Sequence, residues 1–365
     1  MRITEETREE ASRLHAEAII VAAHTDICPD VAKRRAAGSN RVMAERHLPG
    51  LRDGGVTAIC DHVAGDTPYL VEFPFRNTNA ANKLKWALQA IEAMHREAEE
   101  SPDELVIATS VDQIRAAKRD GRVAVVLSFE GAGPVEDAVE LLGAFWRLGV
   151  RCIGLTHDFR NQLADGVRTG SAGGLTDLGR VALREMNRLG IVVDVSHLND
   201  AGFWDVVEQS SAPIHASHSN ARSLCSHPRN LTDEQLRAVA AKGGVVGVHA
   251  LGALVTDREG QPTLDEFLAH ADRLIEVMGE DHVALGPDIM ENYPADEYRL
   301  LWDPRLPTAR LSYVYPAEFA SLSQASNVTA ALLARGYGSV VVRKLLGENM
   351  LRLFEQTWRD EVEVA

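Results

Sequence analysis

Short apolar runs alternate with stretches of helix length along this chain. The clearest pair lies between residues 191 and 220. The run 191–195 ends at Ser196 and His197, and the run 212–216, one helix length later, ends at Ser217 and His218. Runs that are rich in β-branched residues and separated by one helix predict consecutive parallel strands, here with a histidine at each carboxyl end.

The same pattern recurs along most of the chain. It predicts further strands at 18–23, 55–60, 122–129, 150–155, 244–249 and 282–285. It predicts helices at 79–100, 135–148, 176–189, 232–241 and 263–278, and an extra short strand and helix at 105–119. Eight strand-helix units form either an open sheet or a closed barrel.

Polar residues follow six of these eight strands. The exceptions are the second strand and the seventh, which ends at a histidine of ambiguous role. An open sheet binds its ligand at one switch point, whereas a barrel gathers every strand end on one rim. The distribution therefore favours a (β/α)8 TIM barrel with additional helices. We expect one catalytic domain over residues 1–365, with helices from about residue 316 packing on the barrel.

Seven residues at these strand ends have the chemistry of metal ligands or acid-base groups: His24, Asp26, Glu130, His157, His197, His218 and Asp288. Imidazoles combined with carboxylates bind zinc and similar ions. Two ions are the economical arrangement, one held by His24 and Asp26, the other by His197 and His218, with Glu130 bridging. A water between them would be acidified and aimed at a carbonyl or phosphoryl centre.

A single residue of this kind at a strand end is more often a structural residue than a metal ligand. Several at matching strand ends are harder to explain in that way, because burying them without a metal leaves polar groups unpaired. Other histidines have simpler interpretations. His215 should point to the opposite strand face from His218, and His249, at the end of strand seven, is expected to pack in the pocket rather than bind metal. Six other histidines are expected to be solvated or to cap helices: His15, His47, His95, His227, His270 and His282.

Composition narrows the partners and the compartment. There are 38 Lys and Arg residues against 53 Asp and Glu, a net charge of -15, which argues against nucleic acid or an anionic membrane as the partner. The amino terminus lacks a signal-peptide pattern, and the longest apolar stretch, 243–255, is too short to span a membrane. A cytoplasmic protein is expected. The four separated cysteines indicate buried thiols rather than a zinc knuckle or redox pair.

Several motifs together resemble the renal (membrane) dipeptidase family of zinc peptidases. They are His24-x-Asp26, Phe129-Glu130-Gly131, Leu155-Thr156-His157, Asp194-Val195-Ser196-His197, and Ser217-His218-Ser219 followed by Arg229-Asn230. The ending at 347–354 is also similar to that family's carboxyl terminus. The resemblance extends from about residue 15 to 358.

This resemblance implies a barrel of the metal-dependent amidohydrolase type, two zinc ions, and hydrolysis of dipeptides, including those with a D-residue at the carboxyl end, by a metal-bridging hydroxide. The resemblance assigns the same residues to the two zinc ions as the arrangement described above. It further implies that His157 polarises the scissile carbonyl, that Arg229 binds the substrate carboxylate, and that Asp288 moves the proton. It also suggests a homodimer.

Two departures from the family pattern concern the pocket. Ile289-Met290-Glu291 follows Asp288 where Phe-Asp-Gly is frequent, and Asp158 follows His157 where Asn is common. One alternative is another amidohydrolase that acts on an amide or a lactone. Many of those bridge their metals with a lysine on strand four, and residues 150–157 contain none. The other alternative is a barrel without catalysis that serves in binding.

Overall fold

The computed structural model describes residues 4–66, 83–170, 173–291 and 314–359. Its strands are β1 (Val21–Thr25), β2 (Ala58–Gly65), β3 (Leu105–Ile107), β4 (Val123–Glu130), β5 (Val150–Gly154), β6 (Val192–Asp194), β7 (Ile214–Ala216), β8 (Val245–Val248) and β9 (Val283–Leu285). They form one sheet in the order β2-β1-β9-β8-β7-β6-β5-β4-β3, and a further β2–β4 pairing closes it. All ladders are parallel. The predicted eight-stranded barrel is confirmed, with β3 as an added strand outside it.

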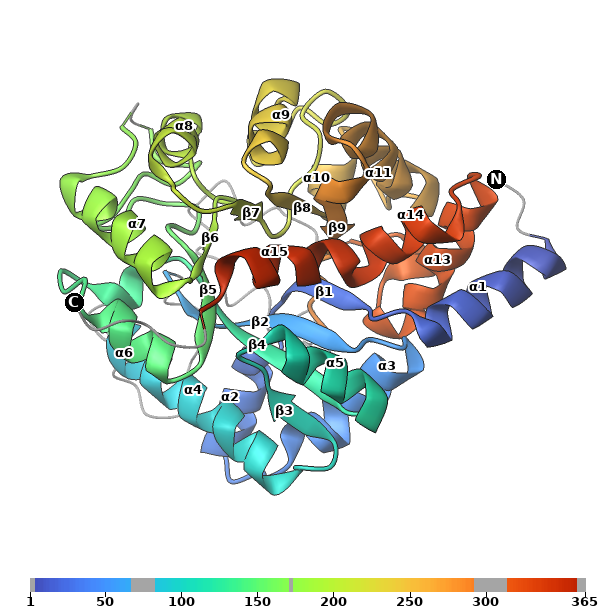
Figure 1. The fold of residues 1–365 in the computed structure, drawn as a ribbon, viewed down its shortest axis with the longest axis horizontal. Coiled ribbons are helices and arrows are strands. Elements are labelled where there is room, and N and C mark those ends of the chain that lie inside the picture. The colour runs from blue at the N-terminus through green and yellow to red at the C-terminus, as the bar shows by residue number, and fades with distance from the viewer. Residues whose placement is uncertain (1–3, 67–82, 171–172, 292–313, 360–365) are drawn as a thin grey trace.

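Helices surround the closed sheet in Figure 1. Their bounds are α1 (Glu5–Glu17), α2 (Cys28–Ala36), α3 (Leu48–Asp53), α4 (Lys83–Glu100), α5 (Val111–Asp120), α6 (Leu141–Arg147), α7 (Asp177–Leu189), α8 (Asp200–Gln209), α9 (Asp233–Ala241), α10 (Gly252–Val255), α11 (Leu264–Met278), α13 (Ala325–Ala334), α14 (Ser339–Arg343) and α15 (Asn349–Thr357). Their ends follow ordinary capping rules. Thr176 caps α7 by accepting the N–H of Gly179, and Gly190 ends that helix with a φ of 71°.

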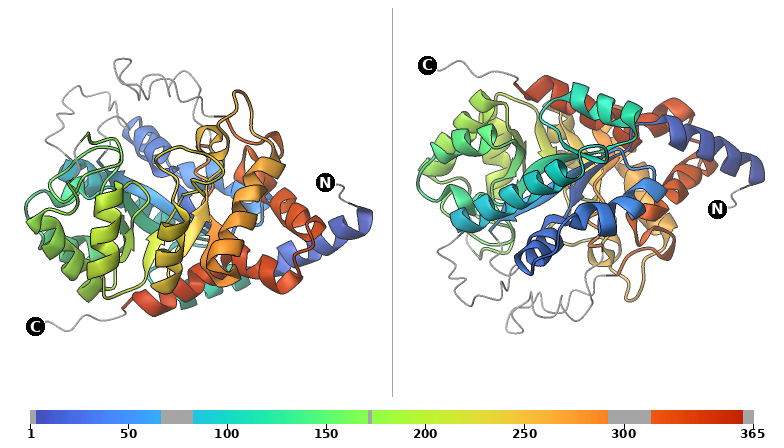
Figure 2. Two further views of the ribbon diagram at one scale, coloured as in Figure 1. Left: turned by 90° about the horizontal axis from the view of Figure 1, so that it is seen from above. Right: turned by 90° about the horizontal axis from the view of Figure 1, so that it is seen from below.

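The amino end of the barrel is covered by the last helix. Small apolar side chains at the starts of the strands, such as Val21, Ala58 and Val245, share one apolar cluster with Met350 and Phe354 of α15. This helix crosses the strands at the front of Figure 1 and lies along the lower edge in the left view of Figure 2. The carboxyl ends of the strands, where the predicted site residues lie, are therefore at the opposite end of the barrel.

Several predicted elements begin or end a few residues away from the predicted positions, and two differ more. The second strand covers Ala58–Gly65 instead of 55–60, so it continues through two polar residues that interrupt the apolar run. The helix expected at 135–148 is only α6, because Glu136 has a positive φ of 53° that is incompatible with helix. The first residues of the helix predicted from 79, and most of the segment 289–316, lie outside the described residues. No described helix is long and apolar enough to cross a membrane.

Candidate metal centre

Glu130 lies at the centre of the residues predicted from the strand ends. Its Oε1 is 2.9 Å from His197 Nε2, 3.5 Å from His218 Nε2 and 3.8 Å from His24 Nε2. Its Oε2 is 3.7 Å from His157 Nε2. Residues from strands far apart in the sequence thus meet at a single carboxylate, which is the geometry that the barrel hypothesis requires.

A single hydroxyl, that of Ser217, sets the protonation of two of these histidines. Ser217 Oγ donates to the carboxylate of Asp194, so its own proton is committed. The Nδ1 atoms of His218, at 2.7 Å, and of His24, at 3.3 Å, must therefore donate to Ser217 Oγ. We assign the Nδ1–H tautomer to both rings, which leaves an unprotonated Nε2 on each.

His197 is set in the same way by a carboxylate. Its Nδ1 lies 2.9 Å from Asp158 Oδ1, and Asp158 Oδ2 lies 2.7 Å from Arg168 Nε. Burial raises the pKa of Asp158, but His157, the bond from His197 and the Arg168 guanidinium outweigh it and hold that pKa well below its usual range. An ionised carboxylate only accepts, so Nδ1 of His197 carries the proton. The Asp that replaces the common Asn thus supports His197.

The donor atoms fit divalent cations. The Nε2 atoms of His197 and His218, both lone-pair acceptors, are only 2.9 Å apart. Among the described residues, His24 Nε2 and Asp26 Oδ1 are buried without a hydrogen-bond partner. Facing lone pairs and unpaired buried atoms cost free energy unless something positive lies between them. Neutral imidazole and carboxylate are also the ligand forms that zinc binds.

The charges of the cluster point the same way. Burial and the nearby carboxylates of Asp26 and Asp288 raise the pKa of Glu130 well above its usual range. Burial and Asp288 raise the pKa of Asp26 to about 7. Burial lowers the pKa of His197 well below its usual range, helped by Arg229. Burial and mutual repulsion therefore disfavour the charged forms of these carboxylates, and bound divalent cations would offset both effects.

Asp288 is held by His249, a contact that sequence reasoning missed. The backbone N–H of Leu251 donates to His249 Nδ1 at 3.1 Å, so the ring proton is on Nε2, which lies 3.2 Å from Asp288 Oδ2. His249 therefore has no spare lone pair for a metal and acts as a hydrogen-bond donor. Burial raises the pKa of Asp288, but His24 and the hydrogen bond from His249 outweigh it and lower that pKa. Its other oxygen is 3.4 Å from His24 Nε2.

His157 and Arg229 border the same cluster. The His157 ring lies beside that of His197, with centroids 4.3 Å apart. Arg229 is 4% exposed and bonds the carbonyl oxygens of Ser196 and His218. Its Nη2 also lies 3.2 Å from His197 Nε2. All eight predicted site residues are thus brought together at one end of the barrel.

Sequence reasoning missed His62 and misplaced three other histidines. His62 lies on β2, and its ring stacks on that of His24, with centroids 3.9 Å apart. The alternation of Ala58, Cys60 and His62 on one strand face would have revealed it. His15, His47 and His270, expected to be solvated or capping, are buried, and their ring nitrogens have partners in Thr329, Asp30 and Val255. Hydrogen bonds to these partners offset the cost of burying the ring nitrogens.

The Ser217 hydroxyl offers a direct test of the tautomer assignment. We expect Ser217→Ala to weaken zinc binding about 10- to 100-fold, because the rings of His24 and His218 lose their shared acceptor. Competition with a coloured chelator measures this loss. Ser128→Ala is the matched control, since this buried hydroxyl donates to the Val126 carbonyl of its own strand and has no hydrogen bond to a proposed ligand among the described residues. Unchanged zinc affinity in Ser217→Ala would contradict the assignment.

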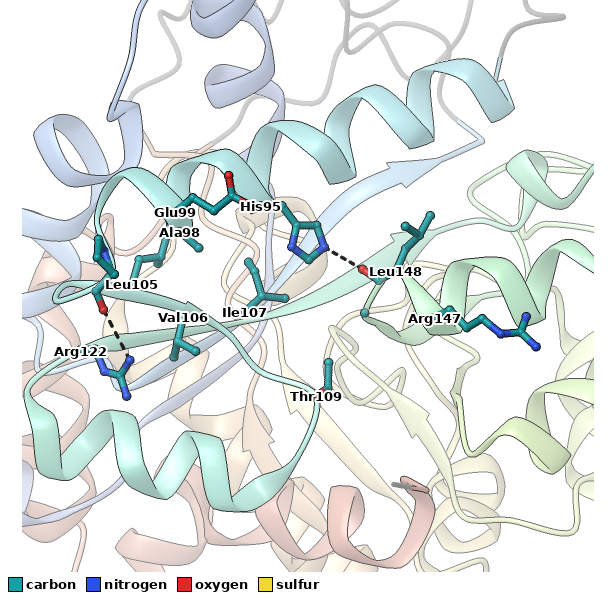
Figure 3. Close-up of a pocket in the computed structure, with 12 residues that line it drawn as sticks. His95, Ala98, Glu99, Leu105, Val106, Ile107, Thr109, Arg122, Arg147 and Leu148 are labelled. Atoms are coloured by element: carbon teal, nitrogen blue, oxygen red, sulfur yellow. Dashed lines mark hydrogen bonds between the residues drawn. The ribbon is translucent and has the colours of Figure 1, made fainter. Parts of the chain in front are cut away.

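A cavity of about 410 Å³ lies elsewhere, on the outside of the barrel. It is lined by α4, β3 and the residues that precede β5, and none of the eight predicted residues borders it (Figure 3). Two of its polar side chains already have partners. His95 Nε2 lies 2.9 Å from the Leu148 carbonyl oxygen, and Arg122 pairs with Asp120 at 2.9 Å. The barrel end is therefore the stronger candidate for chemistry.

Comparisons with known proteins agree with this geometry. The model of the membrane dipeptidase family, peptidase family M19, matches residues 8–296, which include every predicted site residue. A protein from the pqqA 5′ region of Klebsiella pneumoniae, itself uncharacterized, is 35% identical over 71% of this chain and 91% of its own length. The dipeptidase verJ of Clonostachys rogersoniana is 31% identical over 74% of this chain, which spans 65% of that enzyme.

A solved structure extends the likeness to nearly the whole chain. It is a metallo peptidase from Rhodobacter sphaeroides, liganded with a phosphinate mimic of the dipeptide L-Ala-D-Ala. The TM-score is 0.79 at 26% identity, covering 94% of this chain and all of that one. The family match and the barrel with its ligand-type cluster lead to one conclusion: the chain belongs to the membrane dipeptidase family, peptidase family M19, and is a metal-dependent hydrolase.

Proposed function

We propose that this protein is a binuclear zinc dipeptidase that hydrolyses dipeptides, including those with a D-residue at the carboxyl end. The observation that carries the proposal is the meeting of three unprotonated Nε2 atoms, from His24, His197 and His218, around the Glu130 carboxylate. A cluster of neutral nitrogen donors around a carboxylate is a ligand set for zinc rather than for Mg²⁺ or Ca²⁺.

His24 and Asp26 would hold one ion, His197 and His218 the other, and Glu130 would contact both. Its position supports this, because the same oxygen lies within 3.8 Å of a histidine from each pair. When bound, the two ions would lower the pKa of a water between them and polarise the scissile carbonyl.

Asp288 is the candidate proton carrier. His249 donates to one of its oxygens, which leaves the other directed toward the cluster, 3.4 Å from His24 Nε2. Asp288 is ionised at neutral pH, and its oxygen that faces the cluster can accept the proton of the attacking water. The same carboxyl group then gives that proton to the leaving amine.

His157 and Arg229 would bind the substrate. His157 lies at the border of the cluster with its Nε2 near Glu130, where it can donate to the carbonyl oxygen as negative charge develops there. The Arg229 guanidinium would bind the terminal carboxylate, a task that suits its planar geometry, although it also bonds two backbone carbonyls.

Acceptance of a D-residue has support from the Rhodobacter metallo peptidase, whose bound phosphinate mimics L-Ala-D-Ala and whose barrel resembles this one. The single catalytic domain, the homodimer and the cytoplasmic location stay predictions.

Metal removal and restoration test the proposal. The protein is stripped with a chelator, reloaded with zinc, and offered a panel of L,L and L,D dipeptides. We expect loss of turnover on stripping, its recovery with about two zinc ions per chain, and release of free amino acids. Failure to cleave any dipeptide while two ions are bound would direct the search to another amide or a lactone. Activity that survives complete metal removal would contradict the proposal.

A further inference from the structure

Three buried residues form a group of their own, two at the end of β1 and one within β2. They are His24, Asp26 and His62, and one potential ligand atom from each lies within 4.8 Å of the others. Two of them belong to the proposed site. His62 has no role in it, and its position on the neighbouring strand places it beside His24.

Each member of this group has a buried polar atom that lacks a hydrogen-bond partner among the described residues. These atoms are His24 Nε2, Asp26 Oδ1 and His62 Nδ1. A histidine that only packed against a neighbour would normally still pair its ring nitrogens when buried. Three such atoms in adjacent residues cost more than any one alone, because each group loses its water without gaining a partner. A single cation contacted by all three would supply the missing partner.

We propose that His62 is a further nitrogen ligand for the cation that His24 and Asp26 hold. This proposal rests on the proposed function and adds one protein ligand to it. The residue His62 is 3% exposed, and because β1 pairs with β2, the imidazoles of His24 and His62 come from adjacent strands.

The added nitrogen has a chemical consequence. With His24 as its only imidazole, this half of the site would be rich in oxygen and would accept Mn²⁺ readily. A second imidazole shifts the preference toward ions that favour nitrogen, such as Zn²⁺ and Co²⁺. The selectivity for zinc over manganese at this position is therefore a property that His62 should control.

The test uses the full chain after chelation, titrated with Co²⁺ alone. Wild type is compared with His62→Phe, which keeps a flat ring for stacking on His24 but removes both nitrogens, and with His62→Gln. His95→Phe is the control, because His95 lies on α4 outside the barrel. Bound Co²⁺ is counted, and its visible absorption reports the ligands. Melting of the metal-free forms shows that each variant folds.

We expect wild type and His95→Phe to bind two Co²⁺ ions. In His62→Phe one ion should bind about 10- to 100-fold more weakly with a changed absorption spectrum, while the other binds as in wild type. Separate titrations of the same proteins with Zn²⁺ and with Mn²⁺ should show that the ratio of zinc to manganese affinity falls at the weakened position. If His62→Phe folds poorly, His62→Gln should show the same selective loss.

Two results would overturn the proposal in different ways. Wild-type affinities and spectrum for both ions in a folded His62 variant would mean that His62 only packs, and would leave the proposed function intact. Failure of the wild type itself to bind any divalent cation would contradict the proposed function and His62 ligation with it.

Discussion

Replacing Glu130 with Gln is expected to reduce dipeptide turnover by at least about 10³-fold, which corresponds to about 4 kcal/mol in the barrier. The amide keeps the shape of the side chain but removes the negative charge that lies between His24, His197 and His218. Two cations would then face each other without a shared anion, so we expect the chain to retain about one zinc instead of two. Steady-state kinetics and metal analysis measure the two effects.

The metal-free form of this variant provides a control for folding. Because burial and two neighbouring carboxylates already raise the pKa of Glu130, removing its charge should not lower the melting temperature of the stripped protein. Zinc should raise that temperature less in the variant than in wild type, since fewer ions bind the folded state. Glu140→Gln, an exposed position just before α6, should behave as wild type. Full activity in Glu130→Gln would refute the two-metal arrangement.

Asp288→Asn should lower kcat about 10²- to 10⁴-fold, the usual contribution of a positioned general base, with a smaller change in KM. Asn suits this position because the φ of Asp288 is 51°, a region that Asn tolerates well. The amide oxygen can still accept from His249, so the loop should keep its conformation. The lost property is the capacity to take a proton.

Metal content decides how the Asp288 result is interpreted. Two bound zinc ions with low kcat would support proton transfer as its role. Loss of one ion would instead make Asp288 a ligand, which its distance of 3.4 Å from His24 Nε2 also allows. Unchanged kcat with both ions present would exclude both roles.

The alternation of strands and helices reduced the possible folds to an open sheet or a closed barrel, because parallel strands with apolar faces and a regular helix length allow few topologies. The polar residues at most strand ends then favoured the barrel. The second strand shows the limit. Asp61 and His62 interrupt its apolar run, and only the closed barrel, which buries both strand faces, reveals that these polar residues continue the strand. A pattern based on hydrophobicity ends where a polar residue points into a site.

The residues at the centre were predictable from their positions at strand ends, whereas their supporting partners were not. The roles of Ser217, Asp158 and His249 depend on which ring nitrogen each contacts, and that follows from side-chain geometry across different strands. Such contacts cannot be read from the sequence, because His24 and Ser217 are 193 positions apart in the chain. The residues next to these positions in the sequence give no indication of the contacts.

The helix that covers the amino end of the barrel affects how the chain reaches this structure. All eight barrel strands are made before residue 286, but Met350 and Phe354, which complete the apolar cluster at that end, are synthesised more than 60 residues later. A growing chain with every strand in place would still expose the apolar amino end of the barrel to its surroundings. Late synthesis of α15 therefore creates a period of vulnerability to aggregation, during which a chaperone would benefit this protein more than one whose core closes early.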